Sequence, residues 1–293
     1  MNHICCYGEV LWDIFKNKTT VGGAPLNSAL RFNSFKNNVN IISAVGNDSY
    51  GDNLISFLKN SKLSTNFISR NSYETGKVYI ALDKHNNATY NIKKNVAWDF
   101  INLDEQVLKK VKASNAFVYG SLSARSSESK TTLFKLLEIA SFRVFDVNLR
   151  PPNYDYKTLK NLLLKADFIK FNEEEIIEIS NSIGHNYTNL KSCILFVSKF
   201  TKTNSICVTK GEKGAVLYYK NMFFKHDGFK VKVFDTVGSG DSFLAMLINE
   251  LLNKKDPNKS IRKACAIGAM VANKSGANPR FDEKQIQEFI EDY

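Results

Sequence analysis

The sequence predicts an α/β fold, in which a doubly wound and mostly parallel sheet is flanked by helices and carries a small β lid. Two observations predict the sheet. Apolar runs of strand length alternate with helix-length segments, and several runs are continuously apolar, as in strands covered on both faces. A third observation, an alternating segment that departs from this pattern, predicts the lid. With 43% hydrophobic content, residues 1–293 suffice for one such domain.

The expected strands are short apolar runs, some of which end in glycine. The expected helices place apolar residues at helical spacing, as Leu54, Ile55 and Leu58 do. The first run leads into the acidic Glu9 and lacks the basic start and long apolar stretch of a signal peptide, so it is expected to be a buried strand. The predicted strands are residues 4–8, 40–46, 117–120, 143–147, 168–171, 194–198, 205–209 and 215–219, and the predicted helices are residues 29–36, 51–59, 130–140 and 242–254.

The lid is predicted from residues 75–99, which alternate polar and apolar side chains around the Asn86–Asn87 pair. This pattern is typical of an antiparallel hairpin. Residues 14–21 are expected to add a further exposed strand or ribbon. A hairpin inserted into a doubly wound fold is a candidate lid, but an ordinary extension of the sheet fits the pattern equally well.

Composition narrows the class of protein. The formal net charge is +11, but the lysines are scattered along the chain, and no basic cluster with interleaved aromatic residues marks a nucleic-acid path. No apolar run of about 18 residues is present to cross a membrane. The five cysteines form an odd set without a CxxC pair, which favours reduced, buried thiols. We therefore expect a cytoplasmic protein without a nucleic-acid or membrane partner.

The strongest motif is DTVGSGD, residues 235–241, followed by an apolar helix. Small residues before a first helical turn allow the amides of Ser239, Gly240 and Asp241 to point at one spot, where the helix N-terminus adds partial positive charge. Such an anion hole suits a phosphoryl group in transfer. The carboxylate of Asp241 beside it can accept the proton of an attacking hydroxyl, although an aspartate there can also cap the helix.

Common nucleotide-binding signatures are absent from the sequence. There is no GxxxxGK[ST] run, no GxGxxG after the first strand, and no HRD and DFG pair. The chain is therefore not expected to be a P-loop enzyme, a dinucleotide-binding protein or a protein kinase.

With this motif and several others, the sequence resembles the ribokinase-like (PfkB-type) carbohydrate kinases, and the resemblance covers essentially the whole chain. DTVGSGD is similar to the family's C-terminal signature and VGGAPLNSA to its first signature. Within the family, GEVLWD near the start, AWD and NLR look most like fructokinases. The other segments that match in order and spacing are AVGNDSYGDNL (44–54), FDVNLRPPNY (145–154), KFNEEE (170–175) and TKGEKGA (209–215).

The resemblance implies roles on the sugar side. Asp13, Gly23 and Asn27 would hydrogen-bond sugar hydroxyls, although Asn27 can instead cap a helix. Arg150 would lie near the sugar or the γ-phosphate, with a surface salt bridge as the alternative. Asp241 would be the catalytic base, and it is expected to stay ionised at its helix N-terminus. The catalytic group is completed by Gly238, Ser239 and Gly240.

The resemblance also implies a nucleotide site with ATP, Mg²⁺ and a monovalent cation. Glu175 with Asn172 would hold Mg²⁺ through water, although an acidic run also suits a helix start. Backbone carbonyls near Asp235 and Gly276 would supply a K⁺ site. The residues expected to contact the nucleotide are Lys170, Thr209, Gly211, Gly214, Gly238, Gly240, Asn273 and Gly276.

We therefore expect ATP-dependent phosphorylation of the primary hydroxyl of a small sugar, D-fructose to fructose 6-phosphate. Kinases of ribose, 2-keto-3-deoxygluconate or a nucleoside are the alternatives, because Tyr79, Tyr90 and Trp98 of the lid could stack on a base. A sugar sensor without activity would be expected to lack Asp241, and a nucleic-acid-binding protein would show a steep dependence on salt. A monomer and a homodimer paired through the lid remain equally allowed.

Overall fold

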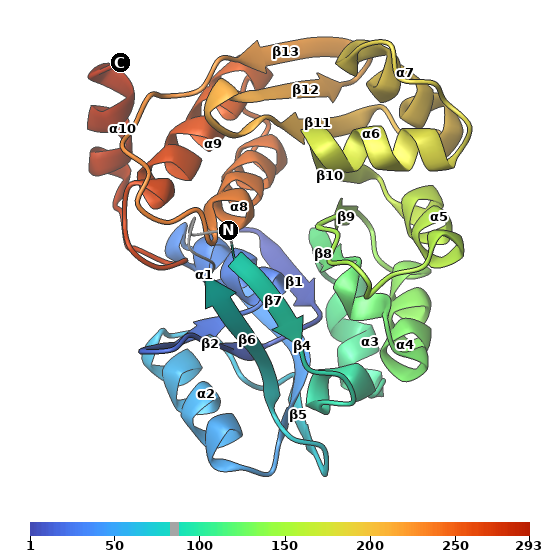
Figure 1. The fold of residues 1–293 in the computed structure, drawn as a ribbon, viewed down its shortest axis with the longest axis vertical. Helices are drawn as coiled ribbons and strands as arrows, with labels where there is room; N and C mark the ends of the chain where they lie inside the picture. The colour runs from blue at the N-terminus through green and yellow to red at the C-terminus, as the bar shows by residue number, and fades with distance from the viewer. Residues whose placement is uncertain (83–87) are drawn as a thin grey trace.

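A nine-stranded sheet runs through the molecule in the order β13-β12-β11-β10-β9-β8-β1-β4-β5 (Figure 1). The computed structural model describes residues 1–82 and 88–293. All neighbouring strands are parallel except β11–β12 and β12–β13. The strands are β1 (His3–Tyr7), β4 (Asn38–Gly46), β5 (Ile68–Asn71), β8 (Ala116–Gly120), β9 (Arg143–Asp146), β10 (Phe168–Asn172), β11 (Ser205–Thr209), β12 (Ala215–Tyr219) and β13 (Met222–His226).

Helices cover both faces of this sheet, which confirms the doubly wound fold. In β1 the side chains alternate, so that Ile4 and Cys6 join one buried cluster while Cys5 and Tyr7 join the other. Both faces are therefore apolar, as parallel strands between two helical layers require. One layer contains α1 (Ala24–Ser34), α2 (Ser49–Asn60), α8 (Ser239–Leu252), α9 (Pro257–Ala272) and α10 (Glu283–Glu291); the other contains α3 (Glu105–Lys112), α4 (Ser127–Leu137), α5 (Tyr156–Lys165), α6 (Glu173–Ser182) and α7 (Leu190–Thr201).

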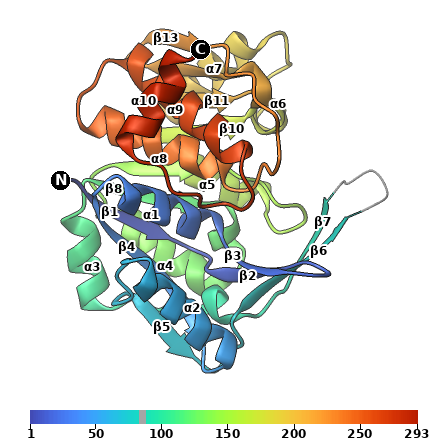
Figure 2. The same ribbon diagram turned by 90° about the vertical axis from the view of Figure 1, so that its left-hand side faces the viewer.

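A second, four-stranded sheet projects from one side of the body (Figure 2). It has the order β3-β2-β6-β7, with β2 (Leu11–Ile14), β3 (Thr19–Gly22), β6 (Gly76–Leu82) and β7 (Ala88–Ile92). The pair β6–β7 is the antiparallel hairpin predicted from the alternating pattern. The Asn86–Asn87 turn expected at its tip lies outside the described residues.

Three short 3₁₀ helices complete the element list: η1 (Ala97–Phe100), η2 (Leu122–Ala124) and η3 (Gly211–Lys213). The first lies where the lid was expected to continue. Trp98, in η1, is only 1% exposed and belongs to the main core, so its assignment to the lid was wrong.

Two further predictions need correction. Residues 194–198 form no strand but lie inside α7, because a short apolar run has no period that separates a strand from a buried helix face. The first helix begins at Ala24, five residues before the predicted start at residue 29, with Pro25 in its first turn.

No helix in residues 1–82 or 88–293 combines the length and apolar character needed to cross a bilayer. All five cysteines are buried and free, as the odd count without a CxxC pair predicted.

Candidate active site

The N-terminus of α8 is shaped by Gly238, whose φ of 76° is left-handed. A side chain there would also meet the backbone of Ala277, since its Cβ would lie 2.4 Å from the carbonyl oxygen. No side chain caps the helix at this end. Among the hydrogen bonds of the described residues, none uses the amides of Gly240 and Asp241, so these two N–H groups can bind an anion.

Ser239 differs from the expectation that it contributes to this anion site. Its amide donates to the carbonyl of Thr236 at 3.2 Å, and its hydroxyl donates to the carbonyl of Gly268 at 2.9 Å. Both donors are therefore engaged within the protein, which leaves two amides instead of the three that the motif suggested. The signal for this turn, a Thr three residues before the helix start, was too weak to read from sequence.

The carboxylate of Asp241 is held by Asn27 rather than by its own helix. Its Oδ2 accepts a hydrogen bond of 2.8 Å from Nδ2 of Asn27, on α1. The Oδ1 of Asn27 in turn accepts one of 2.8 Å from Nδ2 of Asn278. This chain of two amides fixes the carboxylate at the mouth of the anion site, and neither Asp241 nor Asn27 caps a helix.

Burial and the neighbouring Asp146 raise the pKa of Asp241 to about 6, against the lowering effect of the Asn27 hydrogen bond and of Lys170 and Arg150. The helix N-terminus alone, on which the sequence prediction rested, favours the charged form. The carboxylate is still mostly ionised at pH 7, but it is a better proton acceptor than an ordinary aspartate. This is the direction in which a general base is tuned.

Arg150 lies within electrostatic reach of three carboxyl groups. Its charge lowers the pKa of Glu9, Asp13 and Asp241, while burial raises these pKa values to about 7, 6 and 6. The side chain of Arg150 is exposed, and among the described residues its one hydrogen-bond acceptor is the carbonyl of the neighbouring Leu149, at 2.9 Å from Nη1. A cation that faces several carboxyls without a fixed partner is available for an anionic or polar ligand.

Glu9 was not among the predicted site residues. It is 3% exposed, and within residues 1–82 and 88–293 its Oε2 has no hydrogen-bond partner. The sequence did carry a signal, since an acidic residue directly after an apolar strand and a glycine is unusual in a buried position.

The glycine pair of the first signature creates the space around Asp13. A Cβ on Gly22 would lie 2.1 Å from Oδ2 of Asp13, and one on Gly23, with φ of 112°, would lie 2.4 Å from the carbonyl oxygen of Glu9. Gly22 thus makes room for the carboxylate, and Gly23 for the turn into α1. Gly23 and Asp13 therefore lie close together, as expected from the sequence.

The register of the small sheet decides which side chains share a face with Asp13. Asp13 pairs with Val78, and Tyr90 pairs with Ile80, so all four side chains lie on one face. Tyr79 lies on the opposite face. The three aromatic residues proposed to stack on a base therefore do not come together, and Tyr90 alone shares the face of Asp13, with β6 between the two.

A buried ion pair lies behind the anion site. Nζ of Lys170 is 2.8 Å from Oδ1 of Asp146, and both side chains are less than a tenth exposed. Burial lowers the pKa of Lys170, but the raising effect of the charges of Asp146 and Glu175 is larger, so its pKa lies above its usual value. A Cβ on Gly240 would be 3.5 Å from this ammonium group. Asp146 was missed because a single aspartate at a strand end has no distinctive spacing.

A cavity of about 950 Å³ opens on the other side of the α8 N-terminus. Five residues expected at the nucleotide or metal site line it: Thr209, Gly211, Gly214, Gly240 and Asn172. Ser239, Phe229 and Val233 also line it. The space is large enough for a drug-sized ligand, and one end reaches the free amides.

The remaining expected nucleotide residues do not line this cavity. Asn273 donates to the carbonyl of Lys232 at 2.8 Å, and the amide of Gly276 donates to Asp235 at 3.2 Å. The glycine at 214 is required by the chain itself, because a Cβ there would lie 1.9 Å from the carbonyl oxygen of His226.

The side chains expected to hold the metal accept hydrogen bonds from backbone amides. The two oxygens of Glu175 accept from the amides of Asn172 at 2.7 Å and Leu149 at 2.9 Å, and Asn172 accepts from the amide of Glu175 at 2.7 Å. This is the capping box of α6. In the part of the chain that the structure describes, no three acidic, histidine or cysteine side chains form a metal cluster. The donor set therefore fits Mg²⁺ held through its waters rather than by direct ligands.

Asp235, expected near a K⁺ site, also serves two amides. Its Oδ1 accepts from Val237 at 3.0 Å and its Oδ2 from Gly276 at 3.2 Å. The carboxylate thus holds together the two loops whose carbonyls were expected to bind the cation.

Comparison with known proteins finds a matching family model and relatives of similar sequence and fold. The family model described as pfkB family carbohydrate kinase matches residues 1–284. Probable fructokinase-4 of Arabidopsis thaliana is 26% identical over 98% of this chain and 96% of its own length. A fructokinase double mutant from Vibrio cholerae, solved with fructose, ADP and a potassium ion, has a TM-score of 0.86 at 21% identity and covers 99% of this chain and 98% of its own. A putative ribokinase II from E. coli, solved with ATP and Mg²⁺, has a TM-score of 0.87 at 21% identity, with all of both chains covered.

Proposed function

Because the chain belongs to the pfkB family of carbohydrate kinases, we propose that it transfers the γ-phosphoryl group of ATP to the primary hydroxyl of D-fructose and forms fructose 6-phosphate. One observation carries the proposal. The carboxylate of Asp241 is fixed by Asn27 at 2.8 Å beside the amides of Gly240 and Asp241, which no described residue uses as donors, and Gly240 lines the cavity. A proton acceptor and an anion site share one point, which is what phosphoryl transfer to an alcohol requires.

In this mechanism ATP lies in the cavity along Thr209 and Gly211, with its γ-phosphate at the amides of Gly240 and Asp241. The sugar oxygen attacks phosphorus in line while Asp241 accepts the hydroxyl proton, and ADP leaves as the O–P bond to its β-phosphate breaks. Arg150 and the ammonium of Lys170 stabilise the negative charge that develops on the transferred group.

The cofactors of this proposal are supported by the relatives solved with ATP and Mg²⁺ and with ADP and potassium. Mg²⁺ on the phosphates would neutralise their charge, with Asn172 and Glu175 holding its waters. The carbonyls of the loops that Asp235 joins would hold a monovalent cation.

The small sheet of β2, β3, β6 and β7 acts as the lid of a single domain 1–293 in this proposal, and the range 75–99 is shortened to these strands because Trp98 lies in the core. Its face with Asp13 closes on the sugar and excludes water, which protects ATP from hydrolysis. Asp13, Asn27 and Arg150 supply polar groups for ring hydroxyls. A primary CH₂OH group reaches Asp241 with least steric conflict.

Other sugars, such as ribose or 2-keto-3-deoxygluconate, and nucleosides are the alternative substrates. Tyr90 favours this alternative, since it shares the face of Asp13 and is 46% exposed, so that one base could stack on it. A single aromatic ring forms no slot, however, which favours the free sugar.

The test is kcat/KM for fructose, ribose, 2-keto-3-deoxygluconate, tagatose and adenosine, with phosphorus NMR to locate the new ester. We expect fructose to be preferred at least tenfold, with phosphate on its 6-hydroxyl. A tenfold preference for ribose or adenosine would keep the kinase and refute fructose. If none of the five compounds is phosphorylated at the expense of ATP, the proposed chemistry is refuted.

A further inference from the structure

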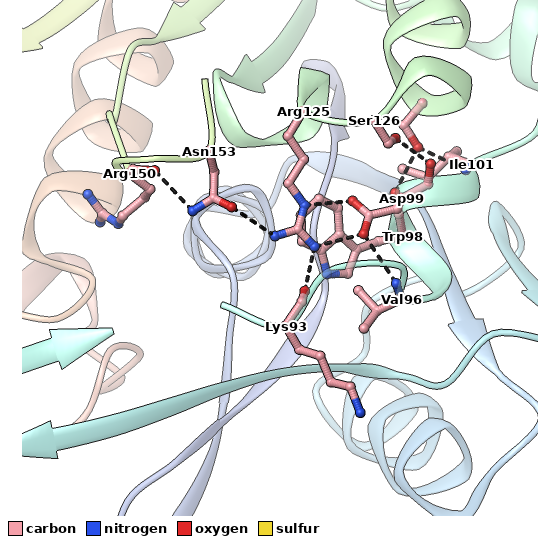
Figure 3. A network of polar contacts seen from close by, with 10 residues as sticks. Lys93, Val96, Trp98, Asp99, Ile101, Arg125, Ser126, Arg150 and Asn153 are labelled. Carbon is pink, nitrogen blue, oxygen red and sulfur yellow. Dashed lines mark hydrogen bonds and ion pairs between the residues drawn. The ribbon is translucent and has the colours of Figure 1, made fainter. Parts of the chain in front are cut away.

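One guanidinium, that of Arg125, makes more polar contacts than any of the predicted site residues, and it lies outside the site described above (Figure 3). Arg125 follows η2 and donates to both carboxylate oxygens of Asp99, through Nε and Nη2, each at 2.7 Å. Its Cζ lies 3.9 Å from the ring centroid of Trp98, so that the guanidinium stacks on the indole. The side chains of Arg125 and Asp99 are only 6% and 3% exposed.

These contacts hold both roots of the β6–β7 hairpin. β6 begins at Gly76, which lies so close to the indole that a Cβ there would be 2.5 Å from Nε1 of Trp98. After β7 ends, the carbonyl of Lys93 accepts a hydrogen bond of 2.6 Å from Nη2 of Arg125. Asp99 also accepts from the amide of Val96 at 3.2 Å.

The same guanidinium reaches the turn that carries Arg150. Nη1 of Arg125 lies 3.5 Å from Oδ1 of Asn153. Asn153 donates to the carbonyl of Arg150 twice, from its side chain at 3.1 Å and from its amide at 2.8 Å. Figure 3 shows this row of contacts from Asp99 through Arg125 and Asn153 to Arg150.

We propose that Arg125 is a positioning residue that fixes the two roots of the hairpin relative to the turn of Arg150, so that the small sheet and Arg150 reach their working positions together. The inference rests on the proposed function, because it assigns the small sheet as the lid and Arg150 as a charge-stabilising group. Arg125 itself touches no reacting atom.

Only arginine satisfies all of these contacts at once. A planar fork serves two carboxylate oxygens, a carbonyl and an amide oxygen while it lies flat on an indole, whereas the ammonium of lysine is a compact charge without a plane. Arg125→Lys therefore keeps the charge near the buried Asp99 but loses the fork. Alanine would leave Asp99 buried and unpaired, which endangers folding.

The chain offers a second bidentate pair as a control, with side chains that are 29% and 31% exposed. Arg143 forms the same bidentate pair with Asp167, at 2.8 Å through Nε and 2.7 Å through Nη2. It is the first residue of β9, at the opposite end of that strand from Asp146 and the site. Arg143→Lys thus makes the same chemical change away from the hairpin and from Arg150.

The experiment compares Arg125→Lys and Arg143→Lys by steady-state kinetics and by hydrogen exchange of residues 76–82 and 88–92 without substrates. We expect Arg125→Lys to lower kcat/KM for the sugar at least tenfold, to leave KM for ATP within twofold, and to speed hairpin exchange at least fivefold; the control changes none of these by more than twofold. Combined with Arg150→Met, Arg125→Lys should lower kcat/KM by a smaller factor than it does alone, because the part of its effect that acts through Arg150 is already lost and only the part through the hairpin remains. Asp99→Asn keeps an acceptor oxygen but removes the negative charge that pairs with the guanidinium of Arg125. It should therefore also speed hairpin exchange.

Hairpin exchange in Arg125→Lys and Asp99→Asn that equals the control would overturn the inference, and so would fully additive kinetic losses with Arg150→Met. The exchange measurement needs no substrate. It therefore still decides the role of Arg125 if the wild-type protein phosphorylates no sugar, which would refute the proposed function alone.

Discussion

Replacing Asp241 by asparagine is expected to inactivate the protein and to stabilise it at the same time. The pKa of Asp241 is raised from its ordinary value of 3.8 to about 6, first by burial. At about 1.36 kcal/mol per pKa unit, keeping this carboxylate ionised at pH 7 costs the folded state about 3 kcal/mol. Asp241→Asn removes that cost, while the loss of the base lowers kcat by about 10²-fold or more.

The pH dependence of this gain follows from the sign of the shift. Between about pH 4 and pH 6 the folded protein keeps a proton that the unfolded chain has lost, so the cost of ionisation grows as the pH rises through this window. Below about pH 4 both states hold the proton and the cost vanishes. Urea unfolding of wild type and Asp241→Asn at pH 4, 5, 6 and 7 should give a difference in the free energy of unfolding that rises from near zero to about 3 kcal/mol.

Asp48 provides a control of opposite sign. Burial raises its pKa, but hydrogen bonds from Thr75 and Gly51 outweigh this effect and leave the pKa below its usual value. Asp48→Asn should therefore destabilise the protein, and more so at pH 7 than at pH 4. A stability difference for Asp241→Asn that does not change with pH, or wild-type turnover in that variant, would refute the reasoning.

Three further predictions concern the same site. First, kcat/KM should rise with pH through about 6 as Asp241 ionises; a profile flat from pH 5 to 7 would contradict it. Second, Glu175→Gln should raise the Mg²⁺ concentration needed for half-maximal activity, and an unchanged titration would show that Glu175 serves only as the cap of α6. Third, saturating sugar should slow hydrogen exchange in the hairpin region 75–99 more than in α10, and equal protection of both would argue against closure.

The fold was largely readable because its signals are local. Continuous apolar runs identified the buried strands, and the alternation after Gly76 identified the hairpin. The run at residues 194–198 was misread because its length and composition suit either a strand or a buried helix face. Trp98 was placed on the lid because nothing in an AWD triplet shows that the chain has already turned into the core.

The site was only partly readable because its geometry is not local. Asp241 and Asn27 carried motif signals, whereas Asn278 and Arg125 did not. The latter two owe their places to hydrogen bonds between distant segments, to Asn27 and to Asp99. The charge state of Asp241 could not be read either, because burial, which raises its pKa, depends on the packing of α1 against α8.

The row Asn278–Asn27–Asp241 also has a consequence for the synthesis of the chain. Asn27 is separated from its two partners, Asp241 and Asn278, by 214 and 251 residues. At bacterial to eukaryotic rates of translation, the ribosome therefore needs roughly 10–50 s after adding Asn27 to reach Asn278. For most of that interval Arg31, one turn further along α1, lacks the hydroxyl of Ser242, and throughout it Arg31 lacks the carbonyl of Pro279, the two groups that accept its hydrogen bonds. A guanidinium that is 2% exposed in the finished protein cannot be buried without them. The nascent chain must therefore keep α1 open to water until α8 and the 279 loop arrive, and no phosphoryl transfer can begin before the last fifth of the polypeptide has docked.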